Sequence, residues 1–102
     1  MRSTMENVTV GPDDNIFEVL GFGQEESANL LIRSRLLSEL QDFIRDSGMT
    51  LRGAADHFGV SHPRISDLMQ GRIDKFKIDY LVNLLSKTGK RMTIQIEDLD
   101  PA

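Results

Sequence analysis

The 102-residue sequence predicts a mainly α-helical domain of five helices with one β-strand at its C-terminal end. Apolar residues recur three and four positions apart in successive segments, which is the spacing of helices that pack on one core. Glycines follow these segments where a helix has to end. Near the C-terminus the pattern changes to a strict alternation of apolar and polar residues, which is typical of a half-buried strand.

Two helices are expected before the middle of the chain. Residues 15–20 predict a short helix that Asp14 or Asn15 caps, with apolar residues available for packing. Residues 24–47 predict the longest helix, with Arg33 on its polar side. The expected apolar positions of this long helix are Ala28, Leu31, Leu36, Leu37, Leu40, Phe43 and Ile44.

A pair of short helices joined by a tight turn is predicted next. Gly59 can take the positive φ that ends the first helix, and Thr50 is the N-cap of that helix. Ser61 caps the second helix, and Pro63 falls in its first turn, where a missing N–H costs nothing. This is the sequence pattern of a helix-turn-helix, which makes double-stranded DNA the first partner to consider.

The outer face of the second helix has side chains that can read base edges. Ile65 and Leu68 lie three positions apart and point toward the core, so the polar residues around them remain outside. In a major groove such side chains donate and accept hydrogen bonds. The alternative is an ordinary helical hairpin whose outer face is solvated. The predicted base-reading residues are Ser61, His62, Arg64, Ser66, Asp67 and Gln70.

Residues 72–77 are expected to form a polar loop directly after this helix. Because of that position, we expect Arg72, Lys75 and Lys77 to contact the phosphates that flank the groove. The alternative is a loop that contacts only solvent. A last helix, from about residue 78 to residue 87, completes the predicted core.

The charge is unevenly distributed along the chain. The formal net charge is -4, which taken alone disfavours a polyanionic partner. Residues 1–28 carry a net charge of -5, and their first part, residues 1–14, is expected to be a flexible acidic segment. Residues 50–91 contain eight basic and four acidic residues, a net charge of +4. The predicted helix pair and its flanks therefore form a local basic surface that suits DNA.

Residues 91–97 carry the strand pattern, with Met92, Ile94 and Ile96 on the apolar side. A single strand cannot satisfy its own backbone hydrogen bonds. We therefore expect it to pair with its copy in a homodimer, as an antiparallel ribbon across a two-fold axis; pairing within one chain, with residues 7–10, is the alternative. Such a dimer would place its two second helices about 34 Å apart and would bind a palindromic operator.

The chain resembles the lambda-repressor-like, Xre-type helix-turn-helix family, most specifically in the helix pair. More narrowly, it is similar to antitoxins of the host-inhibition-of-growth type that are paired with RelE-like toxins. The motifs of this narrower likeness are residues 15–21, Ala28-Asn29-Leu30, Arg33-Ser34, the run from Pro63 to Leu68 and the strand-like tail. The residues behind the wider likeness are Thr50, Ala54, Ala55, Gly59, Val60, Ser61, Ile65, Ser66, Leu68, Gly71 and Arg72, with 78–85 as the closing helix.

The resemblance implies that residues 15–102 form a DNA-binding domain of this type, with residues 91–97 as its dimerisation strand. It also implies phosphate contacts at the start of the first motif helix. Many family members carry Gln directly after the Thr at that point, whereas this chain has Leu51. Thr50 and Arg52 are the expected phosphate contacts there.

Other classes of site find no support in the sequence. There are no cysteines, no apolar run long enough to span a bilayer and no signal peptide, so we expect a cytoplasmic protein. His57 and His62 are five positions apart across a turn and lack a third strong ligand, which disfavours a metal site. No catalytic arrangement is present, so no enzyme activity and no cofactor are expected.

These observations predict a sequence-specific transcription regulator, an antitoxin that represses its own operon and neutralises a RelE-like toxin. One alternative is a protein-interaction module that has lost DNA binding, which Leu51, Asp67 and the net negative charge favour. Another is a stand-alone phage-type repressor without a toxin. The operator sequence does not follow from residue types alone, because base preference also depends on how the helix docks.

Overall fold

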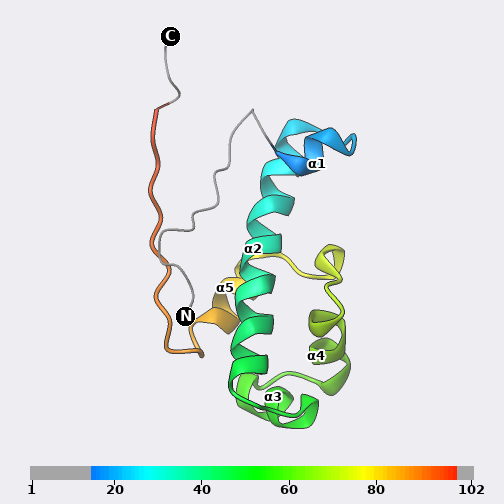
Figure 1. Cartoon of the computed structure of the whole chain (residues 1–102), viewed down its shortest axis with the longest axis vertical. Coiled ribbons are helices and arrows are strands. Elements are labelled where there is room, and N and C mark those ends of the chain that lie inside the picture. Colours follow the sequence, from blue (N-terminus) through cyan, green and yellow to red (C-terminus); the bar gives the residue numbers. More distant parts are fainter. Residues whose placement is uncertain (1–14, 99–102) are drawn as a thin grey trace.

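The computed structural model describes residues 15–98, in which the secondary structure is five α-helices and one 3₁₀ turn. A long central helix runs through the molecule, a short helix folds over its N-terminal end, and the other helices pack along the remainder of its length (Figure 1). The elements are α1 (Ile16–Val19), α2 (Gln24–Asp46), α3 (Leu51–Phe58), α4 (His62–Met69), η1 (Ile73–Lys75) and α5 (Ile78–Leu85).

Side-chain caps start three of these helices, as the sequence predicts. The Asn15 side chain accepts a hydrogen bond of 2.9 Å from the Phe17 amide, so Asn15 rather than Asp14 caps α1. Thr50 caps α3 by accepting from the Gly53 amide at 3.0 Å. The Ser61 hydroxyl accepts from the amide of Arg64 at 3.4 Å at the start of α4. Each cap satisfies a backbone donor that the first helical turn leaves without a partner.

The core lies where α3, α4 and α5 meet one face of α2. Burial of their apolar side chains is the main favourable term for holding these helices together. Phe76, which the sequence places in a polar loop, is only 1% exposed and belongs to this core. The buried residues of the core are Leu36, Leu37, Leu40, Ile44, Ala54, Ala55, Phe58, Ile65, Leu68, Phe76, Leu81, Leu84 and Leu85.

The N-terminal half of α2 differs from the sequence prediction by one position. Ser27 and Leu30 are buried there, whereas Ala28 and Leu31 are only half-buried. A buried serine is tolerated because its hydroxyl donates to the Phe22 carbonyl at 3.2 Å. Because Ser27 is polar, the pattern of apolar residues places the buried face in this half of α2 one position away from where it lies.

The residues around α1 contribute little apolar burial. Ile16, Val19 and Leu20 are 54%, 77% and 66% exposed, although the sequence predicts that they are available for packing. Phe17 packs edge-on against Phe22, with ring centroids 6.1 Å apart. The Asn15 cap and this ring contact are both local, so they order α1 and the turn after it, while Ile16, Val19 and Leu20 face outward.

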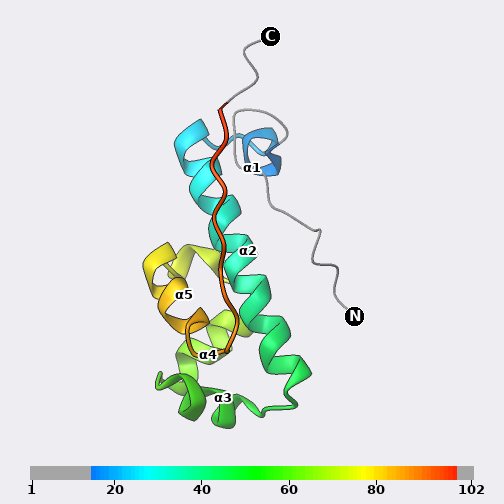
Figure 2. The same ribbon diagram turned by 90° about the vertical axis from the view of Figure 1, so that its left-hand side faces the viewer.

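The C-terminal prediction is the clearest difference between sequence and structure. No strand occurs within residues 15–98; residues 91–97 form an extended segment along the side of α2 that faces away from α4 (Figures 1 and 2). Met92, Ile94 and Ile96 are 41%, 73% and 89% exposed. The physical reason is that a strand exists only when a neighbour accepts and donates its hydrogen bonds, and a single chain offers this segment no such neighbour among the described residues.

Two further expectations concern the remainder of the chain. Residues 1–14, including the alternative strand at 7–10, lie outside the described residues. None of the helices within residues 15–98 combines the length and apolar character that a membrane crossing requires.

Candidate nucleic-acid interface

The turn between α3 and α4 is built as the sequence predicts. Gly59 has a φ of 70°, in the left-handed region, where a residue with a Cβ is strained. The amide of Val60 donates to the Ala55 carbonyl at 3.0 Å, and that of Gly59 donates to the Asp56 carbonyl at 3.3 Å. This hydrogen-bond pattern closes the end of α3 and reverses the chain, so that α4 begins at His62 after only three intervening residues.

The orientation of α4 follows from its two buried residues. Ile65 and Leu68 are 0% and 1% exposed, so the opposite side of the helix faces away from the core. From α2, Gln41 holds α4 in this orientation, because its amide Nε2 donates to the Leu68 carbonyl at 2.8 Å. The outward side of the helix carries Pro63, Ser66, Asp67 and Gln70.

Several of the predicted base-reading residues form one network with the loop that follows. Gln70 donates through Nε2 to the Ser66 hydroxyl at 3.0 Å and accepts from Arg72 Nη2 at 2.8 Å. The Arg72 Nε lies 3.6 Å from the Asp67 carboxylate. The fold thus brings together three residues predicted to read bases and one predicted to contact phosphate. It also fixes their side chains before any ligand arrives, which lowers the entropy cost of binding.

Ser61 and His62 begin the same helix and are exposed. His62 lies on the flank toward α3, where it lines a shallow hollow with Arg52, Asp56 and Val60. The Ser61 hydroxyl is used as the cap of α4. Both residues are accessible to a ligand that contacts the N-terminal end of the helix.

Arg64 takes a different direction from the other predicted base-reading residues. Its guanidinium lies 4.7 Å from the ring centroids of both Phe76 and Tyr80, and its Nη1 donates to the Lys75 carbonyl at 3.2 Å. Stacking on two aromatic rings and a hydrogen bond to the backbone are favourable contacts for this group. To read a base, Arg64 would have to leave them.

The loop between α4 and α5 has two arginine supports. Besides Arg64, Arg33 from α2 donates through Nη1 to the carbonyls of Ile73 and Phe76, at 3.1 and 3.3 Å. Its Nε donates to the Asn29 side chain at 2.6 Å. The sequence prediction that Arg33 belongs to the polar side of its helix is therefore wrong. Its position three residues after Leu30 was a signal for the inner face, but a charged residue is seldom read as part of such a stripe.

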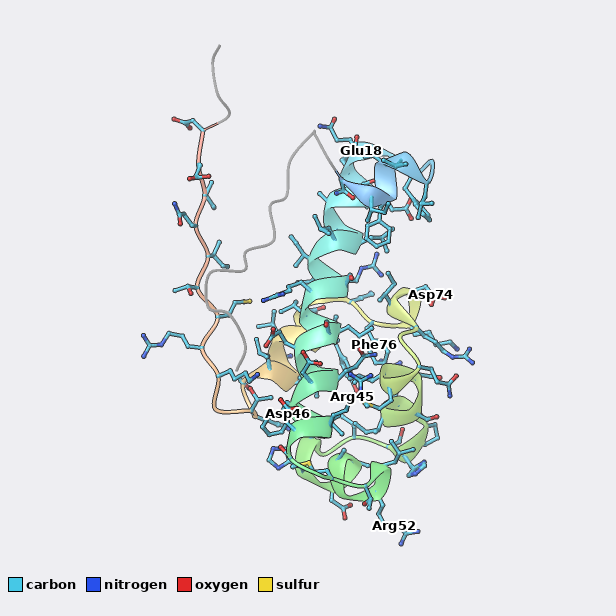
Figure 3. The ribbon with its side chains drawn as sticks, in the orientation of Figure 1. Glu18, Arg45, Asp46, Arg52, Asp74 and Phe76 are labelled. Atoms are coloured by element: carbon cyan, nitrogen blue, oxygen red, sulfur yellow. The ribbon has the colours of Figure 1, made fainter. Side chains whose placement is uncertain are left out.

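The predicted phosphate contacts lie on both sides of α4. Arg72, Lys75 and Lys77 are exposed on the loop that follows the helix. Thr50 and Arg52 are exposed at the start of α3, and Arg52 extends away from the body of the protein (Figure 3). Since α4 lies between α3 and this loop on one side of α2 (Figure 1), its outward face is flanked by basic side chains in both directions.

The histidines do not form a metal site. His57 Nε2 lies 2.8 Å from the Lys87 carbonyl, and its ring packs against that of Phe43 with centroids 5.5 Å apart. His62 lies on the separate hollow described above. Within residues 15–98, no three or more His, Asp or Glu side chains gather in a way that could hold a metal ion.

The fold and this surface define a helix-turn-helix, the class of module that DNA-binding regulators use, rather than an enzyme. In agreement, residues 19–97 match a family model described as a helix-turn-helix domain, and the chain belongs to that family. A comparison with curated proteins gives no significant match.

Proposed function

We propose that this protein is a sequence-specific transcription regulator that binds double-stranded DNA through α4. The observation that carries this proposal is the outward face of α4, which is polar, internally hydrogen-bonded and flanked by basic side chains before and after it. Ser66, Asp67 and Gln70 are the central candidates for base contacts. Arg72, Lys75 and Lys77 on one side, with Thr50 and Arg52 on the other, would contact phosphates and fix the register of the helix in the groove.

A direct test is fluorescence anisotropy with the DNA upstream of the protein's own gene. Ser66→Ala should weaken binding to this DNA about tenfold, with little change for unrelated DNA, because a lost base contact costs about 1–3 kcal/mol only on the correct sequence. The matched control is Ser38→Ala, which replaces an exposed serine on α2. If Ser66→Ala and Ser38→Ala bind the upstream DNA equally well, Ser66 does not read a base.

A protein-interaction module without DNA binding is the second candidate, and Leu51 supports it. This apolar side chain is 38% exposed at the start of α3, next to the residues proposed to contact phosphate. Salt separates the two candidates, because DNA binding releases counterions from the phosphates and therefore weakens steeply as the salt concentration rises. A binding constant for DNA that does not change between 50 and 200 mM salt would favour the interaction module.

We further propose that the regulator acts as a homodimer on a palindromic operator in the cytoplasm. The exposed apolar side chains of Met92, Ile94 and Ile96 support pairing of the extended segment with a second copy. This segment and α4 lie on opposite sides of α2 (Figures 1 and 2). The proposal requires a two-fold axis that brings both copies of α4 to the same side of one duplex.

The finer proposal is an antitoxin that represses its own operon and binds a RelE-like toxin. The resemblance in residues 15–34 and in the run from Pro63 to Leu68 supports it. Co-expression with a small basic reading frame adjacent to this gene tests the role. Rescue of growth and a stable complex would support an antitoxin, and operator binding without any such partner would leave a stand-alone repressor.

A further inference from the structure

From the structure we infer a second interaction surface at α1, which fits a basic protein partner. We call it the α1 patch. It consists of exposed apolar side chains, an adjoining hollow and a rim of carboxylates. The apolar residues are Ile16, Val19, Leu20 and Phe22, and the rim residues are Glu18, Glu25, Glu26 and Asp74.

The apolar residues of the α1 patch lie within seven consecutive positions of the chain, from Ile16 to Phe22. These four residues, in α1 or directly after it, have side chains that are 41% to 77% exposed. By contrast, the apolar residues of α3, α4 and α5 lie mostly in the core. Beside them is a hollow between α1, α2 and η1, lined by Phe17, Phe22, Leu30 and Ile73 among others. Exposed apolar side chains next to a hollow are what a protein partner buries at the centre of an interface.

The carboxylate rim determines the electric charge of the α1 patch. Glu26 and Asp74 line the same hollow, and Figure 3 shows Glu18 on α1 and Asp74 on the loop below it. Among the described residues, these carboxylates have no ion-pair partner. Arg33 also lines the hollow and brings one positive charge, while its Nε and Nη1 donate to oxygens within the protein. The four carboxylates of the rim outnumber this one guanidinium, so the net charge of the α1 patch is negative.

This negative rim decides between the possible occupants. A second copy would bring the same carboxylates against themselves, and like charges across an interface are unfavourable. Residues 1–14 carry Glu6, Asp13 and Asp14 against Arg2, so this segment is also acidic. DNA is excluded by its phosphates. The occupant that complements the α1 patch is a protein that offers an apolar side chain surrounded by lysine or arginine. The inference rests on the proposed antitoxin role in one respect, because that role names a toxin as the basic partner.

The test is an NMR titration of the full chain with two synthetic amphipathic peptides of equal length, one of Leu and Lys, the other of Leu and Glu. The Leu-Lys peptide should shift the amides of residues 16–26 and 73–74, and the Leu-Glu peptide should not. Glu25→Gln with Glu26→Gln should weaken this binding at least threefold. The control is Glu97→Gln, next to the exposed Ile96 of the C-terminal segment, which should not change it.

Several outcomes would overturn the inference. Equal binding of both peptides would show that the carboxylate rim has no role. Amide shifts confined to residues 91–97 would place the interaction elsewhere. If the peptide binds more tightly after removal of residues 1–14, that segment is the occupant of the α1 patch. If the amides of residues 16–22 shift with protein concentration in the absence of peptide, the occupant is a second copy of the chain. Operator binding by the same variants is measured separately, so loss of the proposed DNA function and loss of this surface are distinguishable.

Discussion

Replacing Arg33 by Met tests whether one buried-face arginine supports the loop that follows α4. The substitution keeps an unbranched apolar stem of similar length and removes the guanidinium. In the structure this group donates to the carbonyls of Ile73 and Phe76 at 3.1 and 3.3 Å. These carbonyls lie 40 and 43 positions away along the chain, so the contacts tie α2 to the loop that leads into α5.

The expected loss of stability can be worked from these contacts. A hydrogen bond to a charged group contributes about 1.5–3 kcal/mol to folding. The Arg33 side chain is half-buried and water can reach part of the loop, so the lower end of that range applies. Two such bonds give an expected decrease of about 3 kcal/mol in the free energy of unfolding. The third hydrogen bond, to the exposed Asn29 side chain, adds little.

Urea denaturation followed by circular dichroism at 222 nm measures this decrease. The matched control is Arg45→Met on the same helix, where the guanidinium makes an exposed contact of 3.4 Å with Asp42. That control should cost no more than about 0.5 kcal/mol. If Arg33→Met and Arg45→Met lose the same amount, the guanidinium does not hold the loop and the reasoning is refuted.

Four other predictions follow from single contacts. Gly59→Ala should cost about 1 kcal/mol in thermal denaturation, because φ is +70° while the new Cβ meets only an ordinary contact; an unchanged melting temperature would contradict this. Lys87→Met should cost about 1–2 kcal/mol in urea, since its Nζ donates to the Phe58 carbonyl at 2.8 Å. Ile94→Asp should make the protein monomeric by sedimentation while its helical spectrum is kept, and a persisting dimer would exclude the tail ribbon. Arg64→Ala should weaken binding to correct and altered operators equally if it supports the loop; loss on the correct operator alone would make it a base reader.

Local sequence signals predicted the helix pair because they depend on few neighbours. A cap such as Thr50 or Ser61 and a turn glycine such as Gly59 act within three or four residues of themselves. The structure has each of them in the predicted role. The same holds for Ile65 and Leu68, whose burial follows from helical spacing alone.

Predictions that depended on distant neighbours were less complete. Phe76 looked like part of a polar loop because the residues beside it are charged, yet it is buried in the core. The place of Arg64 on α4 predicts base reading, which stays a prediction, whereas the direction of its side chain is determined by aromatic rings in the loop and in α5. Residues 91–97 have the alternation of a strand, and alternation does not supply the neighbour that a strand requires.

The sequence by itself determined where α3 and α4 begin and end, which side of α4 is buried, and where the basic residues lie along the chain, because these depend on short-range geometry and composition. Only the tertiary structure decided which polar side chains are free for a ligand. Arg33, Gln41 and Arg64 hold backbone carbonyls of other elements. Such contacts depend on how elements far apart in sequence pack together, and a local sequence pattern does not show which elements these are.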